Sequence, residues 1–233
     1  MPEQTTTNPI ARRQFFRNVL LGAVTGAAVA GIEVARPRPL LAQTPLTPDA
    51  ALRELMAGNE RFDNHQLTSI EHDLRMLKEH TVEKQEPFAA VLACADSRVP
   101  IELVFDQTIG HIFVTRVAGN IVTPEIMASL EYAVAVLGVK VLLALGHTGC
   151  GAVKAAMNAD AVPGQISALY QYLQSSVEGS GGDFGQAIAN NAKYQAHVLR
   201  TSSTVVREAL KAAKVRVESG VYDLATGKVT LHG

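Results

Sequence analysis

Two cysteines and one histidine have the residue types and the placement of a metal site. Cys94 follows the apolar run 89–93, and His147 and Cys150 follow the apolar run 141–145. Short apolar runs bounded by turn residues predict buried parallel strands, and open α/β sheets place their active sites at the carboxyl ends of such strands. Two thiolates and one imidazole are the protein ligands of a catalytic zinc, which keeps a fourth position for water. Taken singly, each residue fits a buried apolar cysteine or a loop histidine equally well.

The residues around these ligands resemble the two zinc motifs of the β-class carbonic anhydrases. The motifs are Cys94-Ala95-Asp96-Ser97-Arg98 and Gly146-His147-Thr148-Gly149-Cys150-Gly151, and the resemblance runs from about Ala50 to the C-terminus through the segments 55–62, 113–120 and 131–134. It implies one zinc per chain, held by Cys94, His147 and Cys150. It also implies the reversible hydration of CO₂ to bicarbonate and a proton, by attack of zinc-bound hydroxide on CO₂.

The resemblance assigns catalytic roles to Asp96 and Arg98. In the family this carboxylate and guanidinium pair with each other, and Asp96 then orients the zinc-bound water, whose pKa zinc lowers to about 7. An ordinary loop salt bridge is the alternative. Family members that bind bicarbonate as an inhibitor carry a tryptophan three residues before the first zinc cysteine. Here that position is Val91 and the chain has no tryptophan, so we expect the open-site, plant-type subgroup.

Five further residues match positions that bind substrate in the family. Gln85 lies nine residues before Cys94, at the offset of a glutamine that binds CO₂ or bicarbonate, although a polar residue at a strand entry would look the same. Phe113, Ala118 and Tyr132 match positions of the apolar substrate pocket, partly across the dimer interface; ordinary core packing is the alternative. Gly151 would let the backbone approach the site closely.

The pattern of elements predicts an α/β fold, with a mainly parallel sheet and helices on both faces. Strands are expected over 88–93, 111–117 and 139–145, and a C-terminal hairpin over 215–223 and 229–231. Helices are expected over 48–62, 70–83, 100–105, 124–137, 151–157, 166–176 and 184–214, the last interrupted at 201–203. In the family the N-terminal helical arm wraps a partner subunit, so a homodimer or tetramer is expected.

Residues 1–42 are expected to form an export segment, which leaves a domain over 43–233. The pair Arg12-Arg13 precedes the apolar stretch 19–32, which at 14 residues is shorter than the roughly 18 that span a bilayer. This pattern resembles a twin-arginine signal peptide, although Ala11 stands where Ser or Thr is usual. We therefore expect export to the periplasm or an equivalent compartment, with no membrane span in the mature chain. An N-terminal membrane anchor is the alternative.

An exported protein invites a disulfide between Cys94 and Cys150, but the ligand context favours zinc. The twin-arginine route carries folded protein, so zinc loading in the reducing cytoplasm is expected. A net charge of −1 and a charged fraction of 18% argue against nucleic-acid partners and anionic membrane surfaces. Two other functions stay open: a hydrolase of carbon disulfide or carbonyl sulfide on the same scaffold, and a non-catalytic zinc module. Asp96 and Arg98 argue against the second, because a structural site has no need to hold water.

Overall fold

The computed structural model describes residues 44–69 and 84–232. The described residues all belong to one compact unit. The expected export segment 1–42 and the expected helix 70–83 lie outside the described residues, so both stay predictions.

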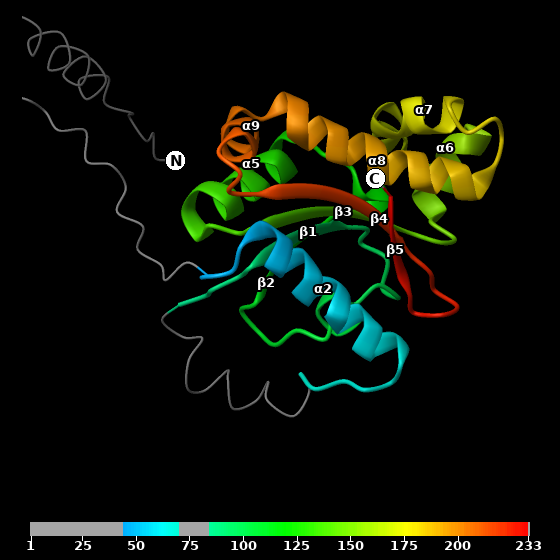
Figure 1. Ribbon diagram of the computed structural model, residues 1–233. Helices are drawn as coiled ribbons and strands as arrows, with labels where there is room; N and C mark the ends of the chain where they lie inside the picture. Colours follow the sequence, from blue (N-terminus) through cyan, green and yellow to red (C-terminus); the bar gives the residue numbers. More distant parts are fainter. Residues whose placement is uncertain (1–43, 70–83, 233) are drawn as a thin grey trace, which may run out of the picture. The chain divides into compact units, whose positions relative to one another are not determined.

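A five-stranded sheet in the order β2-β1-β3-β4-β5 forms the centre of this unit (Figure 1). The strands are β1 (Ala89–Ala93), β2 (Ile112–Arg116), β3 (Val141–His147), β4 (Arg216–Tyr222) and β5 (Val229–His232). The first four pair in parallel, and β5 pairs with β4 in antiparallel register. The predicted mainly parallel sheet and C-terminal hairpin are therefore confirmed.

The helices lie close to their predicted ranges. They are α2 (Pro48–Asp63), α4 (Ile101–Val104), α5 (Pro124–Tyr132), α6 (Gly151–Asn158), α7 (Tyr170–Glu178), α8 (Phe184–Ser202) and α9 (Thr204–Lys211), with short turns η1 (Ala118–Asn120), η2 (Ala133–Leu137) and η3 (Ile166–Leu169). The predicted helix 124–137 is continuous, but its last part, η2, is a π-helix that ends at Gly138 with φ 71°. The predicted break near 201–203 is a single extended residue, Ser203, whose hydroxyl accepts from the amide of Val206 and caps α9.

The alternation of side chains along β1 explains how one strand serves two layers. Ala89, Val91 and Ala93 pack with the α2 side of the sheet, whereas Ala90 and Leu92 pack with α5, α8 and α9. Figure 1 shows α2 on one face and α5, α8 and α9 on the other. A strand buried on both faces must be apolar at every position, which is why β1 reads as a continuous apolar run.

This topology decides where the chemistry lies. β1 and β3 are neighbours in parallel register, with Ala93 opposite Leu145, so the residues that follow them share one edge of the sheet. The sequence predicted that this strand ends at residue 145, with His147 beyond it; in the structure His147 is instead the last residue of β3. No helix within residues 44–69 and 84–232 is long and apolar enough to cross a membrane.

Candidate active site

Cys94, His147 and Cys150 converge at the carboxyl edge of the sheet. Their ligand atoms all lie within 4.8 Å of one another, and the two sulfur atoms are 4.0 Å apart and not bonded. Tetrahedral zinc with Zn–S distances of about 2.3 Å places two sulfurs about 3.8 Å apart. The donor set and its spacing therefore fit zinc without rearrangement, and a disulfide is not formed.

The imidazole of His147 is prepared to act as a ligand. Its Nδ1 lies 2.9 Å from the carbonyl oxygen of Thr148, and because a carbonyl only accepts, Nδ1 carries the proton. Nε2 therefore presents its lone pair, yet it is buried without a hydrogen-bond partner among the described residues. A buried nitrogen left unpaired is costly, and a metal ion would satisfy it while the other ring nitrogen is held by a carbonyl.

Cys94 is stabilised as a thiolate. The hydrogen bond from Cys150, together with that from the amide of Gly119, lowers the pKa of Cys94 against the effect of burial. The Gly119 amide donates to the sulfur at 3.3 Å. Cys150, as the donor in the pair, has its pKa raised. A metal ion bound by both sulfur atoms would displace any proton that they still carry.

Asp96 and Arg98 form the predicted pair beside this group. The carboxylate accepts from the backbone amide of Arg98 at 2.9 Å, from Nε at 2.9 Å and from Nη2 at 2.8 Å. These bonds hold the pKa of Asp96 well below its usual range. The oxygen that meets Nη2 also lies 3.8 Å from Nε2 of His147, so one carboxylate oxygen faces the residues that could hold a metal ion.

Arg116 is a site residue that the sequence did not reveal. From the end of β2 its side chain donates to the carbonyl oxygens of Cys94, at 3.0 Å, and of Asp96. It therefore holds the loop that carries both residues. The strand register places Arg116 opposite Ala93, next to Cys94. This register could have predicted the contact, but only if β2 were already known to be the neighbour of β1.

The five residues expected to bind substrate lie at different distances from the Cys/His/Cys group. Ala118 precedes Gly119, which contacts Cys94, and Gly151 follows Cys150 at the start of α6. A Cβ added at Gly151 would meet nothing within 4 Å, so packing within this chain does not require glycine there. Phe113 lies three residues before the end of β2, so it is about 10 Å from the carboxyl edge of the sheet. Its ring centroid is 6.4 Å from that of Tyr132.

Gln85 does not reach the Cys/His/Cys group of its own chain. It is exposed and precedes β1, whereas Cys94 follows that strand. The five residues of β1 alone separate the two ends by about 16 Å. A substrate role for Gln85 would therefore require the site of a second copy of the chain.

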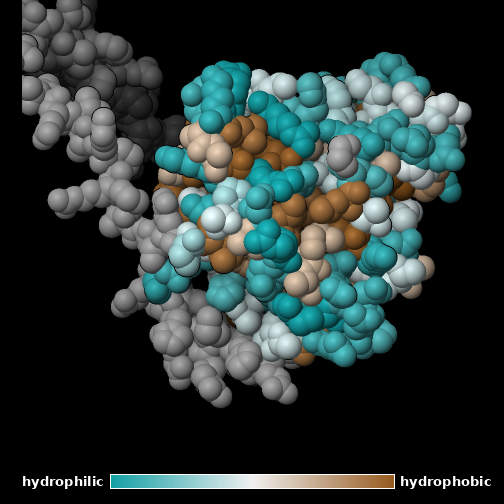
Figure 2. Space-filling model, viewed as in Figure 1, coloured by the Kyte–Doolittle hydropathy of each residue, from teal (hydrophilic) through white to brown (hydrophobic). Residues whose placement is uncertain are grey.

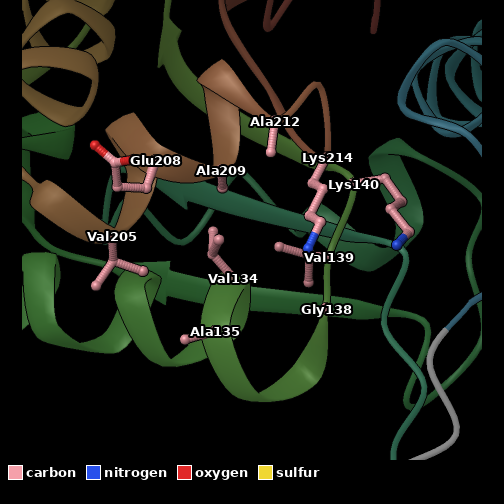
Figure 3. Close-up of a pocket in the computed structure, with 10 residues that line it drawn as sticks. All are labelled: Val134, Ala135, Gly138, Val139, Lys140, Val205, Glu208, Ala209, Ala212 and Lys214. Carbon is pink, nitrogen blue, oxygen red and sulfur yellow. The ribbon is translucent and has the colours of Figure 1, made fainter.

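A cavity elsewhere in the fold is not the active site. It measures about 310 Å³ and lies between η2 and α9 (Figure 3). Val139, Lys140 and Lys214 line it and precede β3 and β4, so it opens at the amino edge of the sheet, opposite the metal ligands. Its lysines adjoin the C-terminal ends of η2 and α9, where cations offset the helix dipole.

Comparisons with known proteins agree with this geometry. The sequence profile of the family described as carbonic anhydrase matches residues 89–229. "Carbonic anhydrase 2" of Mycobacterium tuberculosis is 32% identical over 196 residues, which cover 79% of this chain and 92% of the relative. The carbonic anhydrase of Mycolicibacterium smegmatis is 34% identical over 194 residues, covering 79% and 93%. The chain belongs to the β-class carbonic anhydrases.

Solved structures of the family share the fold. The β-carbonic anhydrase CafA of Aspergillus fumigatus superposes with a TM-score of 0.63 at 26% identity, over 78% of this chain and 90% of that one. The β-carbonic anhydrase CcaA gives the same TM-score at 24% identity, covering 78% and 87%. The reaction of this chain is accordingly the reversible hydration of CO₂, and its Cys/His/Cys group is where a metal ion can bind.

Proposed function

We propose that the chain hydrates CO₂ with one zinc ion per chain, held by Cys94, His147 and Cys150, and that Asp96 and Arg98 are its catalytic residues. The unpaired, buried Nε2 of His147 beside two sulfur atoms 4.0 Å apart carries this proposal. When bound, zinc lowers the pKa of a water to about 7 and so supplies a nucleophile near neutral pH. Zinc therefore provides the reactive group, and the protein provides its orientation.

Asp96 supplies the orientation. Because its pKa is held well below its usual range, it stays ionised near neutral pH and offers only acceptors. A water beside it must point a proton at the carboxylate, which leaves a lone pair free for CO₂. Arg98 keeps the carboxylate in place through a bidentate pair, a geometry that suits its planar guanidinium.

The same pair supports the open-site, plant-type assignment. Both oxygens of Asp96 accept from Arg98, so the carboxylate would have to give up these bonds to become a metal ligand itself. Val91 is fully buried in β1, where the bicarbonate-inhibited members carry a tryptophan. We therefore expect the metal site to keep its water position as the pH falls.

A homodimer or tetramer completes the proposed substrate site. Gln85 lies at the wrong end of β1 for its own metal site, and Tyr132 is 44% exposed. Figure 2 shows hydrophobic residues gathered in the middle of the viewed face between hydrophilic ones, which is typical of an interaction surface. The tetrameric β-carbonic anhydrases of Sordaria macrospora share the fold, at 22% identity and a TM-score of 0.61. We assign Gln85, Phe113, Ala118, Tyr132 and Gly151 to substrate binding in this assembly.

Mixing two inactive variants tests the shared site. Gln85→Ala keeps the metal ligands, and Cys94→Ala keeps the glutamine. If Gln85 acts across the interface, refolding an equal mixture will restore hydration at the sites that combine intact ligands with an intact glutamine. A mixture no more active than the two separate variants would place Gln85 outside the substrate site.

The decisive measurement of the proposed function is the zinc content of the purified chain 43–233 together with its CO₂ hydration rate. We expect one zinc per chain and hydration that a chelator abolishes and added zinc restores. Parallel assays with CS₂ and COS test the hydrolase alternative. A chain with zinc but no activity on any of the three substrates would indicate a non-catalytic zinc module.

Residues 1–42 are proposed to direct the chain to the periplasm by the twin-arginine route. The paired arginines and the short apolar stretch that follows them support this proposal. Folding before export would let zinc bind both thiols in the cytoplasm and protect them from oxidation afterwards.

A further inference from the structure

We propose that Asn191 and Gln195 of α8 are positioning residues for the metal centre. They hold the turn η1 in the conformation that directs the Gly119 amide at the sulfur of Cys94. This inference rests on the proposed metal site, and it adds to that site two residues that touch neither metal nor substrate.

The two side chains form a buried pair one helical turn apart. Asn191 is 0% and Gln195 is 1% exposed, and Nε2 of Gln195 donates to Oδ1 of Asn191 at 2.9 Å. Nε2 also donates to the carbonyl oxygen of Tyr172 on α7 at 3.2 Å. Buried amides on an otherwise apolar helix face are costly unless every group is paired, so this arrangement needs a structural purpose.

Both amides reach the segment 119–122, which begins inside η1 and ends two residues beyond it. Nδ2 of Asn191 donates to the carbonyl oxygen of Gly119 at 2.8 Å and to Oδ1 of Asn120 at 3.2 Å. Oε1 of Gln195 accepts from the amide of Val122 at 2.9 Å. Every polar atom of the two side chains thus has a partner, and the segment 119–122 is fixed at each end.

The fixed segment is the one that contacts the metal ligand. Gly119 has φ 77° and ψ 12°, a left-handed conformation that favours glycine, and its amide lies 3.3 Å from Sγ of Cys94. Asn191 therefore binds the carbonyl of the same residue whose amide donates to the sulfur. Asn191 and Gln195 act on Cys94 through this backbone.

The amide bond to sulfur has two physical consequences for a bound metal. A hydrogen bond to a thiolate stabilises its negative charge, so the sulfur donates less electron density to the metal. It also fixes the direction of the sulfur lone pairs, which pre-organises the ligand. Partners of this kind typically change metal affinity about 10- to 100-fold when they are removed.

The test uses Asn191→Leu, which keeps the approximate volume but removes the donor. The matched control is Asn59→Leu. Asn59 is also a buried asparagine that donates to two backbone carbonyls, of Val104 and Gly227, and accepts from one backbone amide, of Val229. It lies on α2 and contacts no metal ligand, so both variants lose comparable bonds while only one disturbs η1.

Three quantities are measured on the full chain: the free energy of unfolding in urea, the rate of zinc loss to a chelator, and the thiolate-to-metal charge-transfer band of the cobalt(II)-substituted protein. Asn191→Leu should lose zinc about 10-fold or more faster and shift the cobalt band to longer wavelength, because an unbonded thiolate gives up an electron more easily. Asn59→Leu should be destabilised but keep the wild-type zinc-loss rate and band.

If Asn191→Leu does not fold, Gln195→Met is the second variant, since it releases Val122 yet leaves Asn191 in place. A cobalt band at the wild-type position in the folded variant would overturn the positioning role, whatever its stability. Failure of the wild-type chain to bind zinc or cobalt at all would instead refute the proposed metal site, so the two failures are distinguishable.

Discussion

Replacing Asp96 by asparagine should abolish most CO₂ hydration without removing zinc. The carboxylate uses one oxygen for the backbone amide and Nε of Arg98 and the other for Nη2. An asparagine has only one oxygen, so either orientation of its amide sets an N–H group against an N–H group of Arg98. The oxygen nearest Nε2 of His147, at 3.8 Å, is the one that faces the metal ligands, and an amide nitrogen there would donate where an acceptor is needed.

The expected loss is about 100-fold or more in kcat/KM, the usual contribution of a positioned group that accepts a proton or a hydrogen bond from the attacking water. The melting temperature should change little, because the side chain of Arg98 is 58% exposed and exposed ion pairs contribute little to stability. Stopped-flow hydration with a pH indicator measures the rate, and elemental analysis measures the zinc.

Asp49→Asn is the matched control. Asp49 pairs with Arg216 at 2.7 Å on the surface, and its side chain is 67% exposed. This variant should keep both zinc and the wild-type rate. Hydration at the wild-type rate by zinc-loaded Asp96→Asn would refute the orienting role of the carboxylate, and loss of zinc from that variant would indicate that Asp96 holds the metal.

Four further outcomes are expected. Cys94→Ala and Cys150→Ala should each lose zinc and melt roughly 10 °C lower, because zinc at about a thousand times its Kd stabilises the folded protein by about 4 kcal/mol. Wild-type protein stripped of zinc by a chelator should melt at the same lower temperature. Full zinc occupancy in either variant would contradict the assignment of these cysteines as ligands. Burial raises the pKa of Asp106, but four hydrogen bonds outweigh it and hold that pKa well below its usual range. Its stabilising effect is therefore present above about pH 4 and lost as the pH falls further, so Asp106→Asn should be less stable at neutral pH and lose less stability in acid, as measured by urea unfolding. Lysine at both Arg12 and Arg13 should leave full-length precursor in the cytoplasm, and unchanged delivery to the periplasm would indicate the general secretory route. Activity should fall on acidification through a single ionisation at about pH 7, whereas a steep, cooperative loss, or inhibition by bicarbonate outside the active site, would contradict the open-site assignment.

The strands, and the convergence of Cys94, His147 and Cys150, were predictable because their signals are local. A strand buried on both faces must be continuously apolar, and the runs before Cys94 and His147 predict β1 and β3 within two residues of their observed bounds. Parallel strands bring their carboxyl ends to one edge, so two motifs separated by some fifty residues in the sequence were expected to meet. The Asp96–Arg98 pair spans two residues and needs only a local turn.

Only the tertiary structure decided which distant side chains contact the segments around these three residues. Arg116 holds the Cys94 loop because β2 lies beside β1, and Asn191 holds Gly119 because α8 packs beside η1. Such contacts depend on strand order and helix packing, which many apolar patterns satisfy equally well, so no local periodicity specifies them. The position of Gln85 is a similar case. Its offset of nine residues from Cys94 does not say where it lies in space. Because β1 runs between the two residues, Gln85 lies at the opposite end of that strand from Cys94. The sequence thus determined which three residues meet at the sheet edge and which strands carry them, and packing determined which side chains hold the surrounding segments in place.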